Sequence, residues 1–325
     1  MVLSTALLKA LRRDFPGAVI TVLASEGNYE VLKGNPNVDE LLIYRGFIRF
    51  VREILTRDYD LAIDPFITYE LKQAFMTYIS RARYRVGFES VGREVFFNLR
   101  GAAISPPKRM IEHLLDLAEA LGGSRDGCEP EIFLSKEEME EARARMEGAG
   151  VRSGEIKIAF HPGAHYPSQR WPAEAFGKVA KQVRDSKGVR ICLFLANGEE
   201  GLLEGFKAGL GGEPIAFTGI GLREFISLLS QCHLLVCNNS GPLHIASALK
   251  IPTVSIMGPT VFPLWLPWGE DHVVIRKDIG CSPCNKAVCK AHKCMESITV
   301  EEVFEAVRSQ IERRLICHLS SVRQN

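Results

Sequence analysis

The sequence predicts an α/β protein with two domains, each built on a parallel sheet whose strands are joined by helices. Short apolar runs alternate with amphipathic stretches through most of the chain, which is the pattern of strands covered on both faces and of their crossover helices. Glycine or proline turns separate the runs. The length of 325 residues also exceeds the usual size of one α/β domain. We place the two domains at residues 1–150 and 151–325.

The first half contains five predicted helices and five predicted strands. Apolar residues recur at helical spacing between Leu3 and Leu11, so a helix is expected at the start of the chain. Residues 92–107 show no clear period and are expected to form a loop, and the Gly- and Ser-rich stretch 148–154 is the predicted linker. Further helices are expected over 47–55, 69–80, 113–121 and 136–147, and strands over 18–24, 41–44, 61–63, 84–88 and 132–134.

The second half repeats this alternation more regularly. Strands joined by helices in this way form a Rossmann-like sheet, whose ligands bind beyond the carboxyl ends of the strands. Strands are expected over 156–160, 191–195, 215–217, 233–237, 253–257 and 273–275, and helices over 173–183 and 300–315 and from about residues 199, 222 and 241.

Composition and charge exclude several classes of protein. Apolar residues make up 46% of the chain and charged residues 24%, which is ordinary for a globular protein. A net charge of +1 gives no reason to expect nucleic acid. No window approaches the roughly 18 apolar residues of a membrane span, and the basic residues near the start follow the apolar ones, unlike in a secretory signal. We therefore expect a cytoplasmic protein whose nine cysteines are mostly reduced.

The stretch 233–260 gives the clearest local prediction. An apolar strand leads into a turn in which Ser240 or Asn239 accepts hydrogen bonds from the first N–H groups of a helix, and Pro242 suits its first turn. The start of such a helix carries free N–H groups and a positive dipole end, which together bind phosphate. His244 lies within reach of the same ligand. A capped helix without any ligand is the alternative.

Three turns of the second half follow strands and are expected to converge on one ligand. They come after Phe160, Leu195 and Cys237. Because the carboxyl ends of parallel strands share one edge of the sheet, their polar side chains are expected to lie close together. The residues concerned are His161, His165, Gln169, Arg170 and Trp171 in the first turn, Asn197, Glu199 and Glu200 in the second, and Asn239, Ser240, the backbone of Gly241 and His244 in the third.

Six motifs stand out along the chain. They are LKALRRDFPGAVITVL (8–23), HPGA (161–164), SQRWPAEAF (168–176), NNSGPLHIASAL (238–249), PTVSIMGPT (252–260) and CSPCNKAVCKAHKCM (281–295). In their order and spacing, these motifs resemble the glycosyltransferase family of the lipopolysaccharide heptosyltransferases, which use ADP-heptose, and the resemblance covers nearly the whole chain. It implies two Rossmann-like domains facing across a cleft (GT-B type), with the acceptor on residues 1–150 and the sugar nucleotide on 151–325.

The resemblance also implies a reaction. Heptose would pass from ADP-heptose to the inner core of a lipopolysaccharide precursor with inversion at the anomeric carbon, without cofactor or metal, because the amides near Ser240 stabilise the leaving diphosphate. The implied partners are an ADP-sugar donor and a lipopolysaccharide core acceptor, with peripheral contact to the inner face of the cytoplasmic membrane and no nucleic acid. The nucleotide-sugar site would comprise Gln169, Arg170, Glu199, Asn239, Ser240, Gly241, Pro242 and His244.

The chain departs from the family pattern at three places. The family opens with a strand and a Gly-Asp turn whose Asp acts as the base, whereas Met1 to Thr5 resemble the residues that follow that Asp. We therefore expect the catalytic Asp, and with it the first strand, roughly 10 to 15 residues of chain, to lie before Met1. Asn239 and Gln169 stand where the family has Asp and Lys. A sugar-nucleotide-binding paralogue without transfer activity is the alternative function.

Four cysteines form the last cluster of interest in the second half. Cys281, Cys284, Cys289 and Cys294 offer thiols for zinc, but only one Cys-x-x-Cys couple is present, so reduced thiols or a disulfide are the alternative. Cys192, Cys232 and Cys237 are expected in the core.

Arginines and tryptophans leave two further questions open. In the first half, Arg81, Arg83, Arg85 and Arg93 form a basic stretch that suits a phosphorylated lipid headgroup or simply a solvated face. Trp265 and Trp268 either form an aromatic wall for the nucleotide or pack under their loop.

Overall fold

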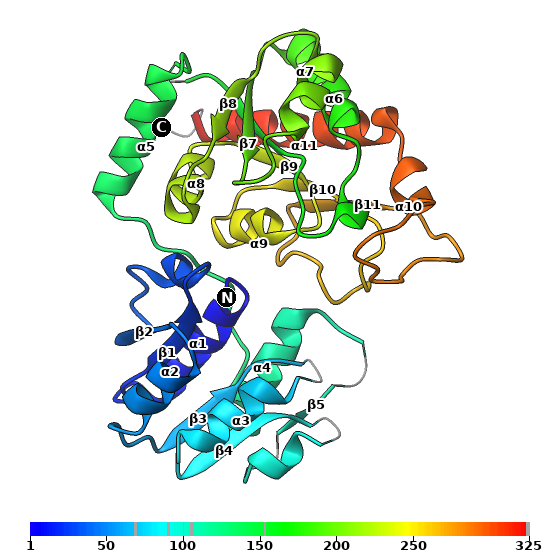
Figure 1. Ribbon diagram of the computed structural model, residues 1–325. Helices are drawn as coiled ribbons and strands as arrows, with labels where there is room; N and C mark the ends of the chain where they lie inside the picture. Colours follow the sequence, from blue (N-terminus) through cyan, green and yellow to red (C-terminus); the bar gives the residue numbers. More distant parts are fainter. Residues whose placement is uncertain (68–69, 90–91, 100, 105–106, 153, 323–325) are drawn as a thin grey trace. The chain divides into compact units, whose positions relative to one another are not determined.

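The computed structural model describes residues 1–322 apart from 68–69, 90–91, 100, 105–106 and 153. The chain divides into two compact units, Met1–Phe133 (unit 1) and Leu134–Asn325 (unit 2) (Figure 1). In both units every described strand pairing is parallel, and α-helices connect most of the consecutive strands. The predicted class, two α/β units on parallel sheets, is confirmed.

Unit 1 holds two small sheets in its described part. β1 (Thr21–Ser25) pairs with β2 (Glu40–Tyr44), and β3 (Leu61–Asp64), β4 (Tyr84–Glu89) and β5 (Ala102–Ala103) form a second sheet in that order. The helices are α1 (Ser4–Asp14), α2 (Phe47–Ile54), α3 (Leu71–Ile79) and α4 (Met110–Ala120), with 3-10 turns η1 (Tyr29–Leu32) and η2 (Glu94–Phe96). The first helix predicted from apolar spacing is confirmed as α1, which buries Ala6, Leu7 and Ala10.

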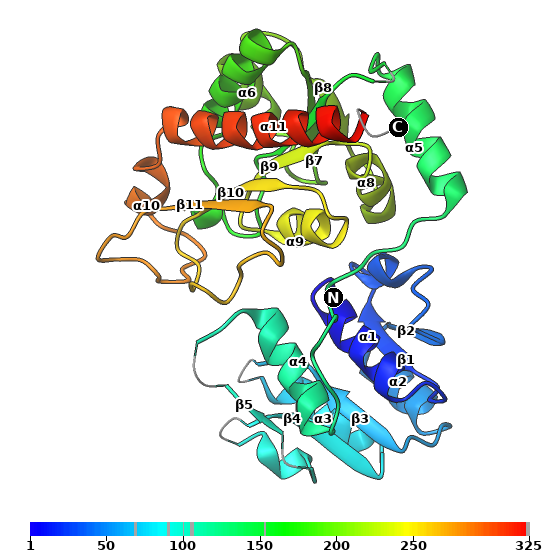
Figure 2. The same cartoon turned by 180° about the vertical axis from the view of Figure 1, so that it is seen from behind.

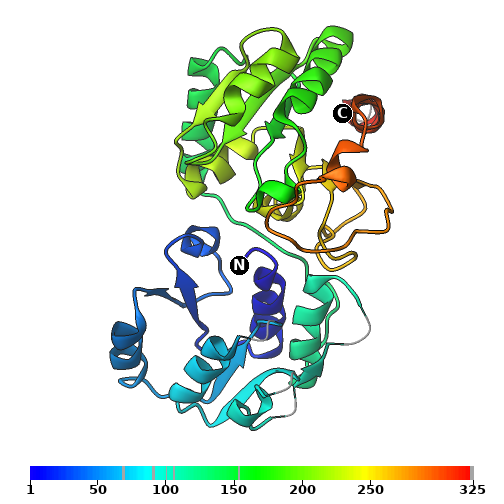
Figure 3. The same cartoon turned by 45° about the vertical axis from the view of Figure 1, so that its right-hand side comes forward.

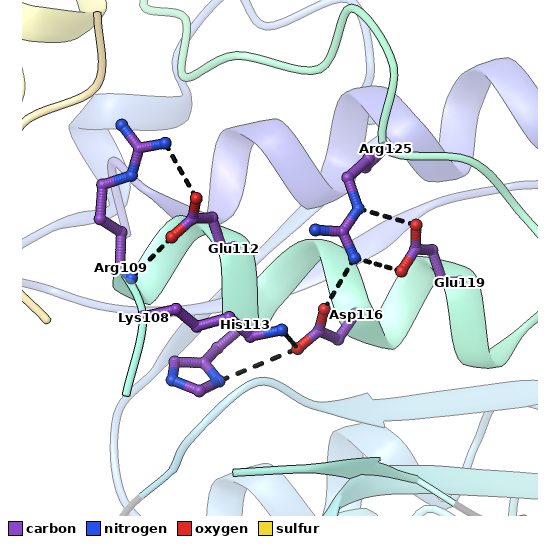
Figure 4. A network of polar contacts seen from close by, with 7 residues as sticks. All are labelled: Lys108, Arg109, Glu112, His113, Asp116, Glu119 and Arg125. Atoms are coloured by element: carbon purple, nitrogen blue, oxygen red, sulfur yellow. Dashed lines mark hydrogen bonds and ion pairs between the residues drawn. The ribbon is translucent and has the colours of Figure 1, made fainter. Parts of the chain in front are cut away.

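A line of ion pairs runs along α4 and fixes both of its ends (Figure 4). At the start, the Arg109 guanidinium pairs with Glu112, whose carboxylate also accepts a hydrogen bond from the Arg109 backbone N–H at 2.8 Å. At the other end, Arg125 bridges Asp116 and Glu119. The Arg125 guanidinium is the main reason why the pKa of Glu119 lies below its ordinary value. The network stabilises the helix that packs against α1.

Arg93 is a buried exception within the predicted basic stretch of unit 1. Its side chain and that of Asp64, the last residue of β3, are both inaccessible to solvent, and the two form an ion pair. Arg93 also donates to the Phe66 carbonyl oxygen at 2.6 Å. The interpretation of Arg93 as part of a charged surface is therefore wrong, whereas Arg81 and Arg83 are exposed.

Unit 2 holds one six-stranded parallel sheet in the order β11-β10-β9-β6-β7-β8. Its strands are β6 (Lys157–His161), β7 (Arg190–Leu195), β8 (Ile215–Thr218), β9 (Leu234–Asn238), β10 (Thr253–Met257) and β11 (His272–Arg276). Its helices are α5 (Lys136–Gly148), α6 (Ala173–Lys187), α7 (Leu202–Leu210), α8 (Leu222–Leu229), α9 (Gly241–Ala248), α10 (Lys293–Glu296) and α11 (Val300–Val322), and η3 (Pro167–Gln169) is a 3-10 turn.

Helices cover both faces of this sheet. α11 and α9 lie on opposite sides of β9 and β10 (Figures 1 and 2), and α11 is seen nearly end-on in Figure 3. On the α11 side, Val303, Val307 and Ile311 belong to the same core as Val236 and Val254. Burial on both faces explains why these strands are continuous apolar runs in the sequence.

The helices α6 and α7 pack closely because each contributes a glycine at the contact. A Cβ atom on Gly177 would lie 2.1 Å from the Phe206 carbonyl oxygen, and one on Gly209 would lie 2.0 Å from the Glu174 carbonyl oxygen. Both oxygens belong to backbone, so the two helices would have to separate to admit any side chain.

Three sequence predictions about element boundaries are wrong. The predicted domain boundary at 150 lies too late, because α5 packs against α8 through the paired Glu138 and Arg223 and therefore belongs to unit 2. Residues 132–134 do not form a strand, since they pair with no described strand. The predicted loop 92–107 contains η2 and β5. None of the described helices combines the length and the apolar character needed to cross a bilayer.

Candidate functional site

The three predicted turns lie at one edge of the unit 2 sheet. β9, β6 and β7 are neighbours in the sheet, and all three run parallel. Their carboxyl ends, at Asn238, His161 and Leu195, therefore lie side by side. This edge is the candidate site, and the following contacts hold its turns together.

Asn238 joins two of the turns and is fully buried. Its side-chain NH2 group donates to the carbonyl oxygens of Pro162 at 2.7 Å and Gly163 at 3.3 Å. Its side-chain oxygen accepts the backbone N–H of Trp171 at 3.0 Å. One amide thus satisfies buried backbone groups on both sides of the segment that follows β6, which fixes that segment against the start of α9.

The start of α9 has no side-chain cap. Ser240 precedes the helix in an extended conformation, and its side chain makes no capping hydrogen bond, contrary to the sequence prediction. Its hydroxyl donates instead to the Asn238 carbonyl oxygen at 3.4 Å. The Asn239 NH2 group donates to the Trp265 carbonyl oxygen at 3.1 Å, and among the described residues no hydrogen bond joins the Asn239 side-chain oxygen to an N–H group of α9. With no side-chain cap, the helix start is left as a positive dipole end that an anion can occupy.

His244 lies in the first turn of α9 and is buried. Burial lowers its pKa to about 4, so the imidazole is neutral at pH 7. Its ring lies 6.2 Å from that of Trp265. Within the described part of the chain, Nδ1 of His244 has no hydrogen-bond partner. A neutral ring with an unused nitrogen is suited to contact a ligand bound at the helix start.

The pKa of His244 makes stability depend on pH. Between about pH 4 and pH 6.5 the unfolded chain binds a proton at His244 that the folded chain does not, so stability falls as the pH decreases through this window. In His244→Gln we expect the difference in unfolding free energy between pH 7 and pH 5 to shrink by about 2 kcal/mol. Urea unfolding at both pH values measures it, with the exposed His165→Gln as control. Equal pH dependence in wild type and His244→Gln would contradict the buried neutral ring.

Glu199 follows β7 and reaches toward the turn after β6. Its Oε2 accepts the Ala196 backbone N–H at 3.0 Å and lies 3.6 Å from Nε2 of His161. The Glu199 carboxylate can lie here because residue 163 is a glycine. A Cβ atom on Gly163 would lie only 2.0 Å from Oε1 of Glu199. His161 is buried, and burial lowers its pKa. The structure therefore places Glu199 beside the first turn, as the sequence predicted.

Gln169 and Arg170 lie at the end of η3, and both are partly exposed. The Arg170 guanidinium donates from Nε at 3.0 Å and from Nη2 at 2.9 Å to the Ala164 carbonyl oxygen. This contact folds the arginine back over its own turn. Its positive charge stays at the candidate site, but two of its nitrogen atoms are already used.

The segment after β10 is fixed to α9 at two points. Asn239 holds the Trp265 carbonyl, and the Ser247 hydroxyl both donates to the Trp268 carbonyl oxygen at 2.7 Å and accepts its backbone N–H at 3.1 Å. The Trp265 carbonyl contact needs an amide donor at position 239, which an Asp would not provide. The tryptophan segment therefore lies along the start of α9.

The cysteine segment also reaches this edge of the sheet. His292 contacts the Ser168 carbonyl oxygen through Nε2 at 2.9 Å, and the Cys284 backbone N–H donates to the Pro259 carbonyl oxygen at 3.0 Å. Cys281 and Cys284 are exposed, whereas Cys294 is buried. Among the described residues, no group of three or more His, Cys, Asp or Glu side chains is arranged to hold a metal ion. The predicted burial of Cys192, Cys232 and Cys237 is confirmed.

The structure places two further residues at this edge. Asn238 is the last residue of β9, whereas the sequence predicts it in the turn that follows. Its position directly after an unbroken apolar run is the sequence signal that points to it. Thr260, just beyond β10, is buried, and its Oγ1 has no hydrogen-bond partner in the described part of the molecule.

Comparison with known proteins places this architecture among glycosyltransferases. Residues 47–295, more than half of the chain, match the family described as glycosyltransferase family 9 (heptosyltransferase). Lipooligosaccharide heptosyltransferase 2 of Campylobacter jejuni is 31% identical over 170 residues, which are 50% of this chain and 53% of the relative, so the chain spans about half the length of that protein. Lipooligosaccharide heptosyltransferase 2 of Haemophilus ducreyi is 27% identical over 94% of both chains.

Solved structures share the fold. A glycosyltransferase family 9 protein from Veillonella parvula superimposes with a TM-score of 0.82 at 23% identity, covering 96% of this chain and 93% of the other. ADP-heptose lipopolysaccharide heptosyltransferase II of Escherichia coli gives a TM-score of 0.76 at 23% identity, covering 97% and 96%. The E. coli heptosyltransferase WaaC with ADP gives 0.71 at 17% identity, covering 96% and 94%.

Proposed function

Because the chain belongs to glycosyltransferase family 9, we propose that it is an inverting glycosyltransferase that transfers heptose from ADP-heptose to the inner core of a lipopolysaccharide precursor. The observation that supports this most is the uncapped start of α9, which lies beside the turns after β6 and β7. The names of the relatives support heptose as the sugar and a lipooligosaccharide or lipopolysaccharide as the acceptor.

The donor site follows from the chemistry at this edge. The diphosphate of ADP-heptose binds at the amides of Ser240 and Gly241, where the helix dipole favours negative charge. The neutral His244 donates one hydrogen bond to it through its ring N–H group. Glu199, as an acceptor held beside Gly163, binds sugar hydroxyl groups of the donor. In this proposal unit 2 binds the sugar nucleotide and unit 1 the acceptor.

The same residues lower the barrier to transfer. Negative charge develops on the diphosphate as its bond to the anomeric carbon breaks, and the fixed amides at the start of α9 stabilise that charge without reorganising. An acceptor hydroxyl attacks from the opposite side, and a carboxylate takes its proton. We also place the reaction in the cytoplasm, at the inner face of the membrane that carries the acceptor.

A transfer assay tests the proposed function. The purified chain, alone and extended by the upstream coding sequence, is incubated with ADP-heptose, an inner-core acceptor lipid and EDTA, and the product is measured by mass spectrometry. We expect the acceptor to gain one heptose despite the chelator. Binding of ADP without transfer by either form would identify a sugar-nucleotide-binding protein instead, and failure to bind ADP would exclude both functions.

Gly163→Ala tests the placement of Glu199 without touching the carboxylate. The new methyl group would overlap the end of a flexible side chain, which can rotate away, so the fold should persist while Glu199 leaves its position. We expect the Kd for ADP-heptose to rise about tenfold, the loss of one or two hydrogen bonds to a charged group. Calorimetry measures it. Gly201→Ala is the control, because a Cβ atom at Gly201 meets no other atom within 4 Å. An unchanged Kd in Gly163→Ala would remove Glu199 from the donor site.

A further inference from the structure

We propose that α2, α3 and η2 of unit 1 form a docking surface for an anionic lipid bilayer. We define this aromatic face by four rings, Phe47 of α2, Phe75 and Tyr78 of α3, and Phe96 of η2. The proposal deepens the proposed function, in which the acceptor is a membrane lipid, but it stands on separate observations in unit 1.

The four rings form a continuous series across three elements. Phe47 stacks on Phe75 with ring centres 6.2 Å apart and planes inclined by 14°. Phe75 meets the edge of Phe96 at 5.9 Å, and Phe96 meets Tyr78 at 6.0 Å. Three elements that are separate in the sequence thus contribute their aromatic side chains to one cluster.

These rings lie partly exposed at the surface of unit 1, unlike the rings of a hydrophobic core, which are buried. Phe47 is 42% exposed, Phe75 is 41% exposed and Tyr78 is 51% exposed. On the same elements, Ile48 and Val95 are more than 70% exposed. Contiguous exposed apolar surface of this kind on a globular unit marks an interaction site, and aromatic side chains are the residues that favour the interface of a bilayer.

The charge of the same segments points to an anionic partner. The elements α2, α3 and η2 carry three cations, Arg49, Arg52 and Lys72, and two carboxylates, Glu53 and Glu94. Three more cations, Arg81, Arg83 and Arg85, follow closely after α3, whereas the whole chain has a net charge of +1. The Arg85 guanidinium lies 5.4 Å from the centre of the Tyr78 ring. Cations on the same segments as an exposed apolar face match a membrane surface with anionic headgroups.

A second copy of the chain fits this face less well. Two copies meeting face to face would bring both sets of cations into one contact, and like charges across an interface repel. A bilayer instead has an apolar interior into which the rings can insert and anionic headgroups that attract the arginines. The occupant that complements both properties is therefore the anionic bilayer surface.

Flotation of the full chain with lipid vesicles tests the proposal. We expect binding to vesicles of phosphatidylcholine containing phosphatidylglycerol, little binding to phosphatidylcholine alone, and weaker binding at high salt. Arg52→Gln/Lys72→Gln should reduce the affinity about thirty-fold, because each cation near an anionic surface contributes roughly a factor of five. Arg143→Gln/Arg152→Gln removes two exposed cations from unit 2 and should change the affinity less than twofold.

A second pair of variants separates apolar insertion from charge. Ile48→Ser/Val95→Ser should weaken vesicle binding at every salt concentration, whereas Val19→Ser/Val288→Ser, which alters two equally exposed side chains elsewhere, should not. Equal binding to both vesicle types, unchanged binding in both test variants, or a concentration-dependent dimer without vesicle binding would overturn the proposal. Binding of ADP in solution is measured on the same proteins, so loss of ADP binding with intact vesicle binding contradicts the proposed function alone.

Discussion

Replacing Arg93 with Met should lower the stability of unit 1 by about 4 kcal/mol, because it leaves Asp64 as an uncompensated buried carboxylate. Both side chains are inaccessible to solvent, and Arg93 also satisfies the Phe66 carbonyl. Hydrogen exchange of peptides that span β3 and β4, followed as a function of urea, measures the loss in this unit separately from the rest of the chain. Arg83→Met, which removes an exposed arginine just before β4, should cost less than about 0.5 kcal/mol.

The loss of stability in Arg93→Met should become smaller as the pH falls. Burial already raises the pKa of Asp64, and without the guanidinium this pKa would rise further. The folded state would then bind the proton more readily than the unfolded state, so the variant should recover stability as the pH falls toward 4. Arg93→Met/Asp64→Leu should be more stable than Arg93→Met at pH 7. If the double variant is the less stable one, the burial of an unpaired charge is not the cause.

Replacing Asn238 with Ala should cost about 3 kcal/mol and weaken ADP binding at least tenfold. The variant leaves the Trp171 N–H and the Pro162 and Gly163 carbonyls without their buried partner, and an unpaired buried group costs roughly 1 to 3 kcal/mol. Because these bonds hold the segment after β6 against the start of α9, their loss lets Glu199 and the helix start move relative to one another.

Two measurements check this prediction. Hydrogen exchange of the β6 and β9 peptides reports the stability of the sheet edge, and calorimetry reports ADP affinity. Gln182→Ala, which removes an exposed side-chain amide from α6, is the matched control and should leave both unchanged. If Asn238→Ala binds ADP as tightly as the wild type, the donor site does not depend on the hydrogen bonds that hold the turn after β6 against the start of α9.

The strength of the sequence signal decided which parts of the fold could be predicted. β9, α9 and β10 were placed within a residue or two because strands buried on both faces are unbroken apolar runs and glycine and proline mark their ends. The boundary near residue 150 was misplaced because α5 exposes many charges and looks like the end of a domain. Its attachment to α8 depends on Glu138 and Arg223, which lie 85 positions apart in the sequence.

The candidate site was predicted in its location but not in its internal contacts. Strand order and the three turns identified the edge, because parallel strands deliver their carboxyl ends to one side. Composition could not distinguish the buried Arg93 from the exposed Arg81, since both are arginines in a basic stretch. Nor could it show that Asn239 is a donor to the Trp265 carbonyl, because hydrogen bonds between distant segments leave no local pattern.

A crystal structure of the complex with ADP tests the central claim most directly. We predict the diphosphate within hydrogen-bonding distance of the Ser240 and Gly241 backbone amides, with His244 and Glu199 in contact with the nucleotide. A diphosphate bound to unit 1, or to a face of unit 2 away from the carboxyl ends of β6, β7 and β9, would contradict the account.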